Sequence, residues 1–122
     1  MPRERSVLMI AYRKVADQAL TLPEVVESTS YGTPALKVRD KLMIRLKEDG
    51  ETLVVRCSWE DRERLLAVYP DMFFVTDHYL GHPWVLMRLA RVGPPVFKPV
   101  LRAAWRLCAS RSLLKANPDL LD

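Results

Sequence analysis

Three short segments, rich in apolar residues and separated by turn residues, each divide into two sets of side chains with the two-residue period of a β-strand, and this pattern constrains the fold more than any other feature. The segments are residues 35–39, 41–47 and 52–56. Short turns join them, and the second turn, residues 48–51, contains an Asp-Gly pair typical of β-hairpins. Strands joined by such short turns pair in antiparallel fashion. The sequence therefore predicts an antiparallel β-sheet at the centre of the fold.

The middle segment predicts what the two faces of this sheet carry. Strict alternation places Leu42, Ile44 and Leu46 on one face and Met43, Arg45 and Lys47 on the other. All charged residues of the three segments are basic, whereas the acidic residues lie in the turns. Neighbouring like charges repel unless they are solvated or matched by an anion. A solvated outer face and an anion-binding face both fit this pattern.

Two further β segments are expected on either side of this group. Residues 24–31 predict a short edge strand that ends in a bend at Gly32. Residues 73–76 and 84–89 are rich in aromatic and branched side chains and predict a second hairpin. Its tip, residues 77–83, carries two histidines, an aspartate and a tyrosine, which makes it a candidate contact surface.

Helical periodicity appears in three places. A first helix is expected from Ser6, as its cap, to about Leu20, and a second helix follows a cap at Ser58. A third helix is expected over residues 99–111, with Pro99 in its first turn. Its apolar stripe, with Trp105 at the border, consists of Val100, Leu101, Ala104, Leu107 and Cys108. Residues 115–122 are expected to form a frayed tail.

These elements predict a single α+β domain over residues 1–122, an antiparallel sheet built from hairpins with N-terminal, middle and C-terminal helices. No apolar run approaches the roughly 20 residues of a membrane span, so no membrane association is expected. Arg13 and Lys14 interrupt the apolar N-terminal run before it reaches signal-peptide length. Cys57 and Cys108 form no CxxC pair and are expected to be reduced and buried, in a cytoplasmic protein.

Charge is distributed unevenly along the chain. Residues 78–118 contain no acidic residue but seven basic ones, so this stretch carries a charge of +7. The whole chain has a net charge of +4, so the remaining residues carry −3. An asymmetry of this size indicates an anionic partner such as a nucleic acid.

Several separated motifs resemble those of the MmcQ/YjbR family. They are residues 30–35 (Ser-Tyr-Gly-Thr-Pro-Ala), the turn at 48–51, residues 74–79 (Phe-Val-Thr-Asp-His-Tyr) with Gly81 and Pro83, and residues 104–107 (Ala-Trp-Arg-Leu). The resemblance covers about residues 7–115. It implies a small bacterial protein with an α+β fold compared with secretion chaperones and with frataxin. It also implies DNA binding, because paired hairpins flanked by helices suggest a double-wing motif.

Non-catalytic nucleic-acid binding, with DNA as the expected partner, is the leading functional hypothesis. Lysine and arginine neutralise phosphates, while aromatic residues at a hairpin tip reach bases or sugars. The expected phosphate contacts are Lys37, Arg39, Arg45, Arg88, Arg91, Lys98, Arg102 and Arg106. The expected base or sugar contacts are Tyr79, His82 and Trp84.

Other chemistries have less support in the sequence. Asp77, His78 and His82 include metal-ligand types, but Gly81 and Pro83 place them in a turn, so no metal or cofactor is expected. The sequence has no phosphate-cradling glycine loop, nucleophile elbow or paired-carboxylate motif, and no enzyme activity is predicted. A small-ligand or enzyme cleft near residues 77–84 remains an alternative, lined by Glu27, Ser28, Tyr31, His78 and Arg88.

The remaining alternative is a protein-binding adaptor or a dimeric, chaperone-like module. In that case the sheet face, or the tryptophans Trp59 and Trp105, would contact another protein or a second copy of the chain.

Overall fold

The computed structural model describes the backbone of residues 2–121 and the side chains of residues 7–121. The strands are β1 (Val25–Ser30), β2 (Thr33–Val38), β3 (Lys41–Leu46), β4 (Thr52–Arg56), β5 (Phe73–Phe74) and β6 (Trp84–Arg88). The helices are α1 (Pro2–Ala19), α2 (Trp59–Val68), α3 (Pro94–Cys108) and α4 (Arg111–Ala116). Two 3-10 turns complete the chain, η1 (Asp77–Tyr79) and η2 (Pro118–Leu120).

All six strands join one antiparallel sheet in the order β1-β2-β3-β4-β6-β5. The pairing of β4 with β6 unites the first four strands with the second hairpin, although α2 separates them in the sequence. The predicted α+β fold is therefore confirmed. No described helix is both long and apolar enough to cross a membrane.

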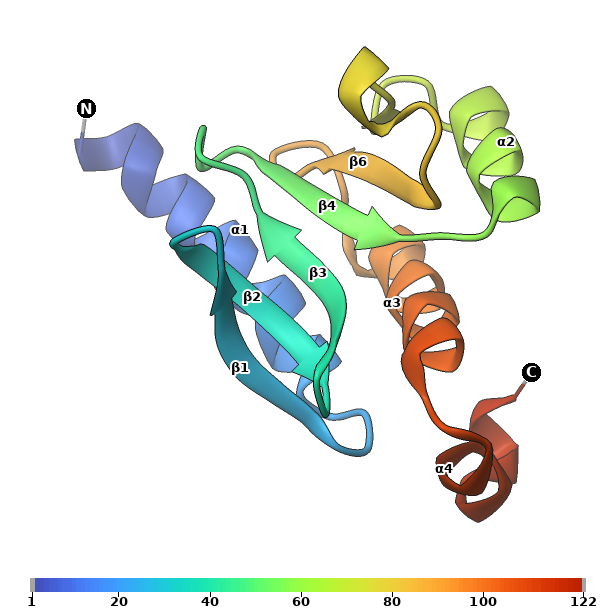
Figure 1. Ribbon diagram of the computed structural model, residues 1–122. Coiled ribbons are helices and arrows are strands. Elements are labelled where there is room, and N and C mark those ends of the chain that lie inside the picture. The colour runs from blue at the N-terminus through green and yellow to red at the C-terminus, as the bar shows by residue number, and fades with distance from the viewer. Residues whose placement is uncertain (1, 122) are drawn as a thin grey trace.

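The two faces of the sheet have different surroundings (Figure 1). Helices α1 and α3 lie behind the sheet and enclose the hydrophobic core against what we call the inner face. No helix covers the opposite, outer face of β1 to β4. A sheet with one packed face and one open face leaves the open face free to bind.

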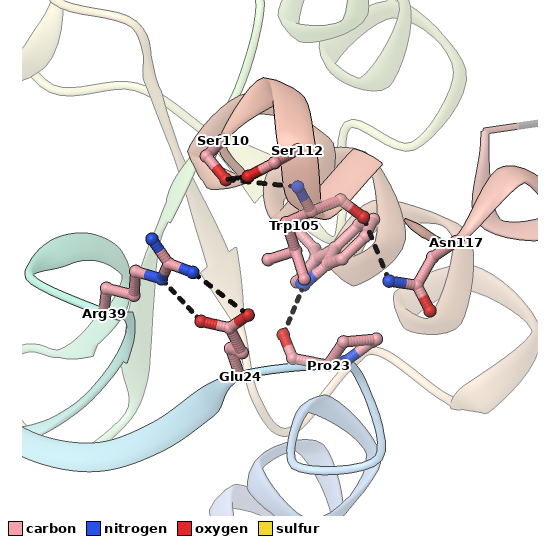
Figure 2. A network of polar contacts seen from close by, with 8 residues as sticks. Pro23, Glu24, Arg39, Trp105, Ser110, Ser112 and Asn117 are labelled. Atoms are coloured by element: carbon pink, nitrogen blue, oxygen red, sulfur yellow. Dashed lines mark hydrogen bonds and ion pairs between the residues drawn. The ribbon is translucent and has the colours of Figure 1, made fainter. Parts of the chain in front are cut away.

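Trp105 anchors α3 to the rest of the molecule. Its side chain is fully buried, and its indole Nε1 donates a hydrogen bond to the carbonyl oxygen of Pro23 at 2.8 Å (Figure 2). Trp105 therefore lies in the core and not at the border of the apolar stripe, and it is not available for the partner contact considered under the adaptor alternative. Leu107, which was expected in the stripe, is 41% exposed instead.

A β-bulge in β3 overturns the predicted alternation. Leu36 pairs with Ile44 and Lys37 pairs with Leu42, so Met43 is left without an opposite residue. A bulge turns two successive side chains toward the same face. Met43 therefore joins Ile44 in the core, while Leu42 faces outward beside Arg45.

Helix boundaries also differ from those predicted. Helix α1 begins at Pro2, so Ser6 lies inside it and is not its cap. Helix α3 begins at Pro94 after an N-cap at Gly93, which places Pro99 inside the helix. Proline suits the first helical turn because its missing N–H is not needed there, and Pro94 and Pro95 already occupy that turn.

The end of the chain is helical where we expected fraying. Ser110 caps α4 by accepting a hydrogen bond from the Leu113 amide, and Asn117 Nδ2 donates to the Leu113 carbonyl at 3.0 Å (Figure 2). Leu113 is itself buried, so packing holds this segment to the domain.

Candidate functional site

A groove of about 390 Å³ lies on the outer face of the sheet. Its lining comes from the β1–β2 turn, from β3 and β4, and from the segment between β5 and β6. The lining residues are Tyr31, Leu42, Arg45, Glu48, Val54, His78, Tyr79, His82 and Trp84. The hairpin tip predicted as a contact surface thus forms one wall of a concave site.

The tip is not an extended hairpin. Strand β5 ends at Phe74, and residues 75–83 form a loop that contains η1. Arg62 of α2 holds this loop: its guanidinium donates hydrogen bonds to the carbonyl oxygens of Tyr79, Leu80, His82 and Trp84 at 2.9 to 3.2 Å. Local sequence patterns do not reveal this role of Arg62, because its partners lie 17 to 22 residues away.

Arg45 is the buried cation of the groove lining. It is 7% exposed and donates hydrogen bonds to the Thr33 hydroxyl, the Glu48 carboxylate and the Tyr79 hydroxyl at 3.2 to 3.3 Å. Burial lowers the pKa of Arg45, but the hydrogen bonds to Tyr79 and Glu48 outweigh burial and leave that pKa above its ordinary value. Arg45 is therefore an internal cation that organises the groove, and the sequence-based expectation of an exposed phosphate contact does not match this position.

Tyr31 stands at the open side of the groove. It is 84% exposed, and the Arg45 guanidinium carbon lies 5.2 Å from its ring centroid. Tyr31 and Gly32 form the two-residue turn between β1 and β2 with φ angles of 53° and 78°. Left-handed backbone is uncommon for a bulky residue, and such turns favour asparagine or glycine at the first position.

The charged strand residues that face outward are all basic. Lys37 pairs with the groove residue Leu42, and Arg56 packs over the ring of Trp84 at 4.5 Å. Arg88 follows the outward-facing Trp84 and Leu86 at even spacing and packs over the Phe74 ring at 4.1 Å. Lys37, Arg45 and Arg88 are thus the charged strand residues on the outer face, and all are basic, whereas Arg56 also lines a hollow with Pro95 and Pro99 of α3.

The inner face receives the one acidic strand residue. Glu27 of β1 pairs with Arg13 of α1 at 3.0 Å. Glu27 therefore does not join Tyr31 and His78 in the cleft that we considered as an alternative site. Lys41 also turns inward, and its Nζ donates to the carbonyl oxygen of Leu107 in α3.

The remaining predicted contacts lie elsewhere. Arg39 pairs with Glu24 at the end of the β2 strand, and Arg91 is exposed in the turn after β6. Lys98, Arg102 and Arg106 line a separate hollow of about 300 Å³ on α3, which packs behind the sheet. The predicted phosphate contacts thus do not form one surface: Lys37 and Arg88 lie on the outer face, whereas Lys98, Arg102 and Arg106 lie on α3 behind the sheet.

The side chains of Asp77, His78 and His82 in the tip do not form a metal site. Within the described part of the chain, no group of three or more His, Cys, Asp or Glu side chains is placed to hold a metal ion. The ring of His78 instead packs edge-on against Tyr79, with 4.7 Å between the ring centroids. Both cysteines are free and buried, and burial raises the pKa of the Cys57 thiol to about 11.

Comparison with known proteins gives a family and a fold. The YjbR family model matches residues 20–107. Uncharacterized proteins of Mycobacterium bovis and Mycobacterium tuberculosis are 34% identical over 68 residues, which is 55% of this chain and 53% of each relative. The match therefore spans about half the length of these curated relatives.

A solved structure extends the comparison to the whole architecture. The crystal structure of Deinococcus radiodurans protein DR2400, with a DUF419 domain, superimposes with a TM-score of 0.64 at 22% identity. The superposition covers 89% of this chain and 84% of that one. The likeness at this identity concerns the fold alone.

Proposed function

This chain belongs to the YjbR family, and from that premise we propose that it is a non-catalytic nucleic-acid-binding protein that uses the outer face of its sheet. The observation that carries the proposal is the charge of the outer face: the strand residues Lys37, Arg45 and Arg88 face outward and are basic, whereas the acidic strand residue Glu27 faces the helices. A surface with cations and no strand acid attracts a polyanion.

Lys37 and Arg88 are the two cations placed to meet phosphates. Lys37 lies on β2 and Arg88 on β6, so they flank the groove on opposite sides of β3 and β4. Arg45 and Arg56 are already engaged, through hydrogen bonds with Tyr79 and Glu48 in the first case and with the Leu42 carbonyl in the second. A nucleic-acid strand lying across β3 and β4 would therefore be held by Lys37 on one side and by Arg88 on the other.

The test is a titration of labelled single-stranded and duplex DNA by fluorescence anisotropy, at about 50 and about 200 mM salt. We expect binding that weakens steeply with salt, because each phosphate contact releases a counterion. The double substitution Lys37→Glu, Arg88→Glu should abolish measurable binding at the higher salt concentration.

A matched control is available on the opposite side of the molecule. Lys98→Glu, Arg102→Glu changes the net charge by the same amount but alters only the α3 hollow. This variant should bind as the unmodified protein does at the higher salt concentration, where long-range charge effects are screened. The proposal fails if no nucleic acid binds at low salt, or if the α3 variant loses binding while the outer-face variant keeps it.

A further inference from the structure

We propose that the outer-face groove holds one unpaired base of a single strand, an inference that rests on the proposed function and specifies its substrate. The groove combines aromatic walls from Tyr31, Tyr79 and Trp84 with an apolar base from Leu42 and Val54. Stacking on aromatic side chains is the common means by which proteins hold unpaired bases. A base inside a duplex is stacked on both faces by its neighbours and paired at its edge, so this site selects single strands over duplexes.

The volume of the groove is suitable for a single base. Pockets for small-molecule ligands have volumes of roughly 300 to 1,000 Å³, and this groove has about 390 Å³. It therefore admits one ring system and not a duplex. The duplex would have to remain outside, in contact only with Lys37, Arg88 and the groove rim.

The electrostatics of the groove favour a ring over a phosphate. Arg45 forms an ion pair with the Glu48 carboxylate at 3.3 Å, and Glu48 also lines the groove. A phosphate entering here would meet that carboxylate, whereas an uncharged base would not be repelled. His78, His82 and the Glu48 carboxylate instead provide hydrogen-bonding groups for the edge of a base.

Tyr31 gives the independent argument for ligand contact. A ring that is 84% exposed contributes little to the core, yet it occupies a turn position whose φ of 53° is unfavourable for a tyrosine. An asparagine would suit that turn better. The strained backbone of Tyr31 costs the fold stability, and its ring is exposed beside the groove. Together these two features indicate that the ring contacts a ligand.

The turn also supplies a decisive variant. Tyr31→Asn removes the ring but leaves a residue that accepts left-handed backbone, so the protein should remain folded. Tyr31→Phe keeps the ring and serves as the matched control. With a labelled 12-nucleotide single strand, we expect Tyr31→Asn to raise the Kd roughly five- to 150-fold and Tyr31→Phe to change it less than twofold.

A competition experiment shows whether the bound base comes from a single strand, a duplex or a free mononucleotide. Unlabelled single strand should displace the labelled strand at much lower concentration than the matching duplex or the mononucleotide. The inference is overturned if duplex competes equally well, if mononucleotide competes equally well, or if Tyr31→Asn binds normally. If binding remains salt-dependent and sensitive to Lys37→Glu, Arg88→Glu in those cases, the proposed function stands without the base site.

Discussion

Arg62 and His82, twenty residues apart in the sequence, are joined by a hydrogen bond of 2.9 Å from the arginine Nη1 to the main-chain carbonyl oxygen. The same guanidinium also reaches the carbonyls of Tyr79, Leu80 and Trp84. One side chain of α2 thus holds the loop that forms a wall of the groove. The shape of the candidate site depends on this arginine, although Arg62 does not line the groove.

Arg62→Gln should loosen the loop without unfolding the domain. The variant loses charged hydrogen bonds to carbonyls, and we expect a decrease of roughly 2 kcal/mol in unfolding free energy. Amide hydrogen exchange should become faster across residues 77–83 and remain unchanged in β3 and β4. Arg64→Gln, on the same helix but exposed, is the control. Unchanged exchange in the loop of Arg62→Gln would show that other contacts hold it.

Trp105→Phe should be strongly destabilising. It leaves a void in the core and removes the donor for the Pro23 carbonyl, so we expect a loss of about 2 to 3 kcal/mol in urea unfolding. Trp59→Phe is the control, because Trp59 is 52% exposed and should change stability by less than about 0.5 kcal/mol. Equal stability of the two variants would contradict the anchoring role of Trp105.

Gly32→Ala should lower stability through backbone strain alone. Gly32 has a φ of 78°, and an added Cβ would meet no atom within 4 Å, so no clash contributes. We expect a cost of about 1 kcal/mol in thermal or urea unfolding. Gly81→Ala also enters open space, but at a residue outside the left-handed region, and it should be close to neutral. A neutral Gly32→Ala would mean that the turn relaxes.

The pair between Glu24 and Arg39 predicts a small pH dependence. The hydrogen bond from Arg39 lowers the pKa of Glu24, although desolvation opposes the effect (Figure 2). A lowered carboxyl pKa stabilises the folded state above the unfolded pKa, and this contribution is lost as pH falls through the folded pKa.

Glu24→Gln should therefore lower the Tm slightly at neutral pH, and the difference from the unmodified protein should vanish in acid. Asp40→Asn provides a charge-matched control. A difference in Tm that persists unchanged at low pH would rule out the ion pair as its cause.

Local patterns accounted for most of the elements. The Asp-Gly pair at 49 and 50 and the alternation in β4 predicted their hairpin, and Ser58 caps α2 as expected by accepting a hydrogen bond from the Asp61 amide. These predictions held because turn chemistry and capping depend on residues close together in the chain.

Features that depend on contacts between residues far apart in the sequence were not predicted. The bulge at Met43 follows from pairing between β2 and β3, and the start of α3 at Pro94 places Phe97 in the core. In the site, the tip residues Tyr79, His82 and Trp84 do share one groove, as their proximity suggested. The burial of Arg45 was not predicted, because alternation identifies a face of the sheet but does not show what covers that face.

By itself, the sequence determined the α+β class, the hairpins and an excess of positive charge after residue 77, because each is a property of composition or short-range spacing; the family followed from the resemblance of its motifs and from the matching family model. Only the tertiary structure decided that Arg45 is internal, that Arg62 holds the loop, and that Lys37 and Arg88 lie on a different surface from Lys98 and Arg102. The reason is that burial and charge pairing arise between residues brought together by the sheet.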